Sequence, residues 1–320
     1  MEIPRCTRDD VPLEFLIMYI KIILLLLLCS NAVYATSQAP WMTGALLAPA
    51  GETVKPGHIN FEPYNFYTIY STPYRNNEIS PVIEFGLLNF LDIMATAPYD
   101  ISWDRGQKGH KIGDSTVALG LQIHRQKDGS VLPNFRIIVQ EILPSGMFDD
   151  LDPDKLGTDQ TGVGSYQTTL GFNFEYLSLL INNHYLKSHL SLVGSKGSDV
   201  NVKGNNAFGG SLTTDGKVKP GFSYSVDLAF EYQLTQNWVP VFEALYTHSG
   251  TLSFAGNPGF TPGGAIGSIG GDGGNVVSLA PAIEYNFNSN IGIIAGVWFT
   301  ISGPGSGKFI SNTIALSYTF

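Results

Sequence analysis

The chain has 320 residues, of which 43% are hydrophobic and only 14% are charged, and its formal net charge is −9. Intrinsic disorder needs high charge and few aromatic residues, and nucleic-acid binding needs a basic cluster, so this composition excludes the first and argues against the second. A helical membrane protein is also excluded, because the single long apolar run lies near the N-terminus.

Residues 1–35 are predicted to be a secretory signal peptide. Lys21 supplies a basic residue, 22–28 form a short apolar core, and the segment ends in a small-x-small pattern. We place signal cleavage between Ala35 and Thr36. The apolar core is too short to span a bilayer as a helix, so it is interpreted as a cleaved leader and not as an anchor.

The start of this leader is unusual, because residues 1–17 contain four acidic side chains. Translation from Met18 would give an ordinary basic leader, and Met18 is therefore interpreted as the true start. Both cysteines, Cys6 and Cys29, lie within the leader. The mature chain is thus expected to lack thiols, which excludes disulfides and cysteine-based metal sites.

Residues 36–57 come between the leader and the first predicted strand. They contain Trp41, Leu46, Leu47 and three prolines. Two arrangements fit this composition. We favour a periplasmic lead-in, and the alternative is a plug or latch that enters the interior of the following domain.

Beyond residue 58 the hydrophobic pattern has period two, which is typical of strands with one apolar face. In the segment 222–234, for example, every second residue is apolar and the residues between are small or polar. Twelve such segments are predicted, at 59–69, 79–88, 92–103, 114–125, 131–142, 166–176, 184–194, 222–234, 238–248, 275–287, 291–302 and 308–320.

The connections between these segments are mostly short and long in alternation, and aromatic residues gather near the segment ends. An even number of strands of about ten residues with this asymmetry is typical of an outer-membrane β-barrel. The predicted fold is therefore all-β, a transmembrane antiparallel up-and-down barrel of about 12 strands over residues 58–320. A soluble β-sandwich, the alternative, predicts no asymmetry of the loops. With both termini periplasmic, the long loops face the outside.

The alternation also predicts which side chains face the lumen. Ten charged residues fall on the small and polar face, and we interpret them as channel-lining: Glu84, Asp92, Asp100, Arg136, Glu175, Lys187, Asp227, Glu231, Glu243 and Glu284. An acid-biased lining favours cations. The alternative is that these groups pair with one another and fill the barrel, because a 12-stranded barrel lies between the packed and the open sizes.

A candidate metal site lies in the long loop 143–165, where Asp150, Asp152 and Asp154 occupy alternate positions, as in a calcium-binding loop. Lys155 and Thr161 stand where such a loop needs Gly and Glu, so a solvated acidic loop is the favoured interpretation. No cofactor is predicted.

Catalysis is not predicted either. The sequence has no Gly-x-Ser-x-Gly motif. Only His110 and His248 fall near the outer rim with an acid or a serine close by in the sequence, namely Asp114 and Ser249.

Two short motifs resemble known families. The C-terminal residues 314–320, Ile-Ala-Leu-Ser-Tyr-Thr-Phe, resemble the terminal signature of bacterial outer-membrane barrels, which implies that Tyr318 and Phe320 are read by the barrel assembly machinery. Residues 41–49 and 57–64 resemble the opening of outer-membrane transport proteins of the phenol meta-pathway family (MetA-pathway of phenol degradation). That resemblance implies a channel for hydrophobic or aromatic compounds.

These observations predict a passive channel for small solutes in the outer membrane of a Gram-negative bacterium. The alternative function is a structural or surface-interaction barrel with a closed lumen and partner-binding loops. The expected partners are outer-membrane lipid and lipopolysaccharide, the barrel assembly machinery and a small-molecule solute, with no nucleic acid.

Overall fold

The computed structural model describes residues 40–181, 183–304 and 307–320. The predicted leader, its cleavage site at Ala35 and Thr36 and the start at Met18 lie outside these residues. No helix among the described residues is long and apolar enough to cross a membrane.

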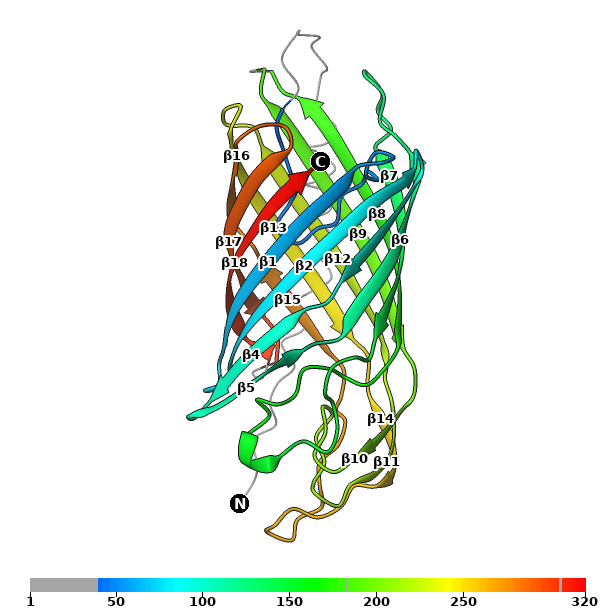
Figure 1. Ribbon diagram of the computed structural model, residues 1–320, viewed down its shortest axis with the longest axis vertical. Helices are drawn as coiled ribbons and strands as arrows, with labels where there is room; N and C mark the ends of the chain where they lie inside the picture. The colour runs from blue at the N-terminus through cyan, green and yellow to red at the C-terminus, as the bar shows by residue number, and fades with distance from the viewer. Residues whose placement is uncertain (1–39, 182, 305–306) are drawn as a thin grey trace.

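The predicted fold is confirmed, because the main sheet closes into an antiparallel barrel of 12 strands (Figure 1). β1 pairs with β18 on one side and with β2 on the other, which leaves no edge at the join. The wall is built from β1 (Ile59–Tyr70), β2 (Arg75–Leu88), β3 (Leu91–Thr96), β4 (Tyr99–Asp104), β5 (Gln107–Ile112), β6 (Ser115–His124), β7 (Asn134–Leu143), β8 (Gln167–Leu179), β9 (Tyr185–Gly197), β12 (Phe222–Tyr232), β13 (Trp238–Ser249), β15 (Gly274–Leu279), β16 (Ala282–Asn286), β17 (Ile291–Ser302) and β18 (Phe309–Thr319).

Some wall strands are interrupted where the sequence predicted continuous ones. The segment 92–103 is divided into β3 and β4 next to Pro98, and the segment 275–287 into β15 and β16 next to Pro281. Proline has no backbone N–H to give to a ladder, which is the physical reason for both breaks. The wall stays joined at the first break, since Gly113 N donates to Pro98 O at 2.8 Å.

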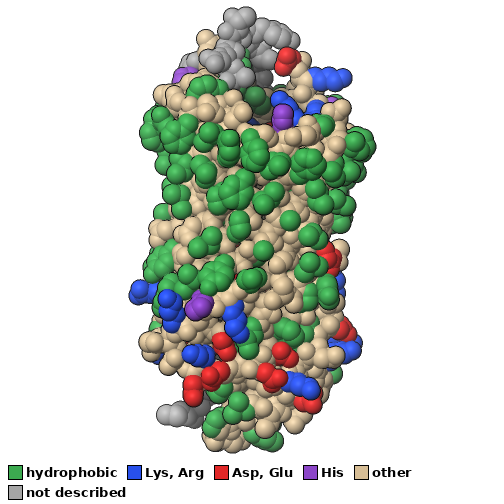
Figure 2. Space-filling model, viewed as in Figure 1, with side chains coloured by type: hydrophobic (Ala, Val, Ile, Leu, Met, Phe, Trp, Pro, Cys, Tyr) green, Lys and Arg blue, Asp and Glu red, His purple; other side chains and the backbone are tan. Residues whose placement is uncertain are grey.

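The two faces of the wall have opposite chemistry. On β2, Ile79, Ile83 and Phe85 are exposed on the outside while Glu84 is buried on the inside. Apolar side chains form a broad belt across the face seen in Figure 2, and most of the charged side chains on this face lie beyond the belt, toward the lower end. Exposed apolar residues around buried carboxylates are the reverse of a soluble domain, and this arrangement fits a wall that faces lipid.

The long loops contain structure that the sequence did not predict. β10 (Val200–Lys203), β11 (Asp215–Lys219) and β14 (Ser253–Asn257) form a separate three-stranded sheet at the lower end in Figure 1. Val202 and Val218 are fully buried in it. The loop before β8, which carries the 3₁₀ helix η1 (Pro153–Lys155), joins this sheet through Phe148. We call this assembly the extracellular cap, because short turns mark the periplasmic end of such barrels and long loops the outer end.

Candidate functional site

The interior of the barrel is the candidate site, and its charged residues are concentrated toward the periplasmic end. The side chains of the ten predicted channel-lining residues all lie on the inner face, where nine are buried and Lys187 is partly buried. Asp92, Glu231, Glu243 and Glu284 have no solvent-exposed surface. Such carboxylates need hydrogen-bond or ionic partners, since burying an unpaired charge is costly.

Residues 40–57 supply many of these partners, because this N-terminal segment contacts the inner wall. Glu243 accepts hydrogen bonds from three successive backbone N–H groups, those of Leu46 at 2.9 Å, Leu47 at 3.0 Å and Ala48 at 2.5 Å. One carboxylate thus accepts the hydrogen bonds of three consecutive backbone N–H groups. Of the two arrangements considered for this segment, the structure has the interior one and not the favoured lead-in.

Other inner side chains bind the same segment in a similar way. Glu284 accepts from Thr43 N at 2.5 Å and from Thr43 Oγ1 at 2.7 Å. Gln122, which the sequence analysis did not select, accepts from Thr53 N at 2.7 Å. Glu175 accepts from Gly51 N at 3.2 Å and Asp92 accepts from Val54 N at 3.0 Å.

The order of these contacts describes the path of the segment. From Thr43 to Val54, the acceptors lie on β16, β13, β8, β6 and β3 in succession, and the segment then reaches β2, where Gly57 N donates to Gly86 O at 2.8 Å. The same strands follow one another in this order around the sheet. The segment therefore curves along the inner wall before it enters β1.

Apolar packing fixes the start of this path. Leu46 is fully buried in a cluster with Val239, Val241 and Ala315 from the wall. Gly296 leaves room for it, because a Cβ atom there would lie 2.9 Å from Leu46 Cδ2. The space that this inward glycine leaves on the wall is thus filled by the segment.

One group of charges is organised by Arg136. Its guanidinium binds Glu84 and also Asp92, the latter at 2.7 Å. Gly120 lies beneath these side chains, and a Cβ atom at that position would collide with both Asp92 and Arg136. The predicted base therefore pairs with two of the predicted acids.

A second group of charges lies on β9 and β12. His189 Nε2 is 2.5 Å from Glu231 Oε1, and Lys187 Nζ is 3.7 Å from the same oxygen. Lys187 also donates to Met42 O of the N-terminal segment at 3.2 Å. These networks keep the interior polar, and they leave it with more acidic than basic side chains.

Two of the predicted lining residues belong to neither group of charges and form no hydrogen bond with the segment among the described contacts. Asp100 lies toward the outer end and accepts from Asn76 at 2.9 Å. Asp227 Oδ1 has no hydrogen-bond partner among the described residues. Glu62, which is not among the predicted lining residues, also lies inward and accepts from Ser317 at 3.1 Å.

The acidic loop does not gather its carboxylates around one point. Asp152 caps η1 and accepts from Asp154 N at 2.9 Å, while Asp152 N donates to Asp159 at 2.9 Å. Burial and the adjacent Asp150 raise the pKa of Asp149. Across the described residues, no three His, Cys, Asp or Glu side chains are placed to hold a metal ion.

The histidines considered for catalysis have other partners. His110 Nδ1 is 2.8 Å from the hydroxyl of Tyr99, and His248 Nδ1 is 2.7 Å from Asn275 Oδ1. At the C-terminus, Phe320 N donates to Ile59 O at 2.9 Å where the barrel closes, and the Phe320 ring is exposed beside Tyr318.

No family model matches the chain, and no curated protein matches it. Its structure is similar to that of the COG4313 outer membrane channel from Pseudomonas putida F1, with a TM-score of 0.61 and 11% identity over 84% of this chain and 98% of that chain. Weaker similarities are to the NanC porin (TM-score 0.43, 9% identity, 81% of this chain and 98% of that chain) and to the KdgM porin in complex with disordered oligogalacturonate (0.41, 6%, 82% and 99%). The TM-scores of these two weaker similarities are too low to support a conclusion about this chain.

The first similarity shows the fold. The chain has the fold of an outer-membrane β-barrel. Its closed wall and exposed apolar belt fit a barrel whose outer face contacts lipid.

Proposed function

We propose that the protein is a passive outer-membrane channel for small solutes. Its periplasmic half would be narrowed by residues 40–57, which the inner carboxylates hold against the wall. No energy source and no chemical step is involved. The observation that carries this proposal is the order of the segment's contacts around the wall.

A segment that follows the wall leaves the barrel axis available, whereas one that crosses the interior would block it. Twelve strands at ordinary spacing and tilt give a mean Cα radius of about 12 Å. That radius has room for a layer of chain against the wall, with a narrow space beside it. The geometry therefore favours a constricted channel over a wide, unselective pore.

Cation preference follows from the excess of acidic groups around the interior. Arg136 and Lys187 are outnumbered by the inner carboxylates, and an excess of negative charge close to a narrow path attracts cations and repels anions even where the carboxylates themselves are buried. The family resemblance of the N-terminal motifs adds a further proposal, which is affiliation with the phenol meta-pathway outer-membrane family and hydrophobic or aromatic solutes. A solute screen distinguishes these two proposals, because a polar interior favours small cationic or polar solutes and the family resemblance implies hydrophobic or aromatic ones.

Single-channel recording of the refolded mature protein in a planar bilayer tests the proposal. The expected result is discrete, cation-selective conductance steps. The double variant Glu231→Gln, Glu284→Gln should move the reversal potential toward lower cation selectivity, and a matched outward change, Glu141→Gln, should leave it unaltered. Unchanged reversal potentials in the double variant would contradict the acid-lined path.

A silent barrel that is folded and heat-modifiable would favour the alternative function, a structural or surface-interaction protein. The extracellular cap provides the surface for that alternative, because its loops are ordered by their own apolar core. Conductance thus separates the two functions directly.

A further inference from the structure

The outer face of β2, β4 and β5 changes character in steps toward the extracellular end. The ladder aligns Ile79, Tyr99 and Ile112 in one outward row. The next outward row consists of Asn77, Ile101 and His110, and the row after that of Arg75, Trp103 and Lys108. Within two rows, the lipid-facing surface passes from apolar to cationic and aromatic.

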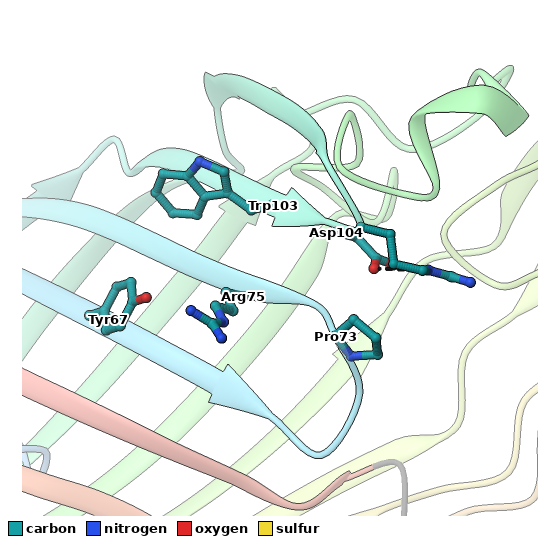
Figure 3. Close-up of a pocket in the computed structure, with 6 residues that line it drawn as sticks. Tyr67, Pro73, Arg75, Trp103 and Asp104 are labelled. Carbon is teal, nitrogen blue, oxygen red and sulfur yellow. Dashed lines mark hydrogen bonds and ion pairs between the residues drawn. The ribbon is translucent and has the colours of Figure 1, made fainter.

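This last row borders a cavity of about 540 Å³, lined by Tyr67, Pro73, Arg75, Trp103, Asp104 and Arg105 (Figure 3). Lys108 Nζ lies 5.6 Å from the centre of the Trp103 ring. Arg75 is exposed and forms no ion pair with any of the described residues. Figure 2 shows basic side chains and a histidine gathered just beyond the apolar belt, over β4 and β5.

The acidic residues of the same strands point the other way. Glu78 and Asp100 face each other across β2 and β4 on the inner side. Asp104 is buried and pairs with Arg105 at 3.1 Å, while 64% of the Arg105 side chain stays exposed. The outward charged residues of these strands are therefore basic, although Figure 2 shows acidic side chains just beyond them and the whole chain has a net charge of −9.

We propose that this surface, which we call the basic–aromatic row (Arg75, Trp103, Lys108, with Tyr67 and Arg105), binds the phosphorylated sugar headgroup of an outer-leaflet glycolipid. Arginine and lysine pair with phosphate, and the half-buried indole of Trp103 presents an aromatic surface beside them for a sugar ring. The row lies at the level where headgroups meet the apolar belt, so acyl chains extend over Ile79 and Ile112 below it. This inference depends on the orientation of the barrel and not on whether the lumen conducts.

Binding of purified lipid A to the detergent-solubilised protein, followed by native mass spectrometry, tests this proposal. The variant Arg75→Gln, Lys108→Gln should bind bis-phosphorylated lipid A about thirtyfold more weakly, because each basic group near a lipid surface contributes roughly a factor of five. The matched control is Lys127→Gln, which removes an exposed base from a periplasmic turn. It should bind as the wild type does, and heat-modifiable migration verifies that each variant is folded.

Two arms use the wild-type protein alone and identify the ligand. Dephosphorylated lipid A should bind as weakly to the wild type as bis-phosphorylated lipid A binds to the double variant. Millimolar inorganic phosphate should not displace the lipid, and displacement would show a site for free phosphate instead. Equal binding of the two forms of lipid A, or unchanged binding by the double variant, would overturn the proposal.

Discussion

Two parts of the chain outside the wall pack at opposite ends of the barrel, and different forces hold them. At the periplasmic end, residues 40–57 are fixed mainly by hydrogen bonds from their backbone to wall carboxylates such as Glu243. At the outer end, the extracellular cap is fixed by its own strands and by buried Val202 and Val218. The first attachment depends on single wall residues, whereas the second is largely independent of the wall.

This difference matters for function. Charge-assisted hydrogen bonds are strong only while both partners are present, and their loss leaves several buried N–H groups unsatisfied. A change to one wall carboxylate should therefore release the N-terminal segment without unfolding the barrel. No single wall substitution should release the cap.

The largest expected effect comes from Glu243→Ala. Loss of the acceptor for three N–H groups should weaken attachment of the segment by about 3 kcal/mol. The ratio of released to attached segment should then rise more than a hundredfold. A cysteine at the buried Ala45 position would be the mature chain's only thiol, so its rate of maleimide labelling reports release.

The expected result is protection of Ala45→Cys in the wild-type background and fast labelling alongside Glu243→Ala. Asp227→Asn is the matched control, since Asp227 is also a buried inner carboxylate but accepts no hydrogen bond from the segment among the described contacts. Equal labelling rates in the two backgrounds would show that the carboxylate does not hold the segment.

The cap should respond to its own core instead. Val202→Ala removes two methyl groups from a fully buried site and should destabilise the cap by about 2 kcal/mol. Limited proteolysis within residues 198–221 should accelerate while labelling at Ala45→Cys stays slow. The control is Val131→Ala, where the valine is 85% exposed. Accelerated labelling in Val202→Ala would mean that the two ends are coupled.

A smaller effect is expected from Gly292→Ala. A Cβ atom there would lie 2.5 Å from Asn286 Oδ1 and 2.7 Å from Thr43 Cγ2, so both side chains must shift and the hydrogen bonds that hold the segment weaken, at a cost of about 1 kcal/mol. Labelling at Ala45→Cys should rise about fivefold. Gly271→Ala, at a position with open space around the new Cβ, should leave the rate unaltered. An unchanged labelling rate in Gly292→Ala would show that Thr43 does not help to attach the N-terminal segment to the wall.

Period-two alternation was sufficient to predict the barrel and the direction of its side chains. Glu84 and Glu284 face inward as expected, because register on a half-apolar strand is fixed by the apolar face. The hairpin β4–β5 was partly missed, since its outward residues Trp103 and Lys108 break the apolar pattern.

What the carboxylates bind could not be predicted from the sequence. Their partners are backbone N–H groups of residues 40–57, which every sequence has and which no residue type marks. The one signal available was the pair of wall glycines, Gly292 opposite Thr43 and Gly296 opposite Leu46, and it has meaning only once the register is known. The cap was missed for a similar reason, because β10 and β14 are far apart in sequence and pair only through β11.

The central claim is a narrow solute path constricted by residues 40–57, and single-channel conductance of the wild type beside Glu243→Ala and Asp227→Asn tests it most directly. The account predicts small, cation-selective steps in the wild type and in Asp227→Asn, and clearly larger steps in Glu243→Ala. Silence in all three folded proteins would contradict it and would leave a closed barrel. Equal steps in all three would show a path that the segment does not constrict.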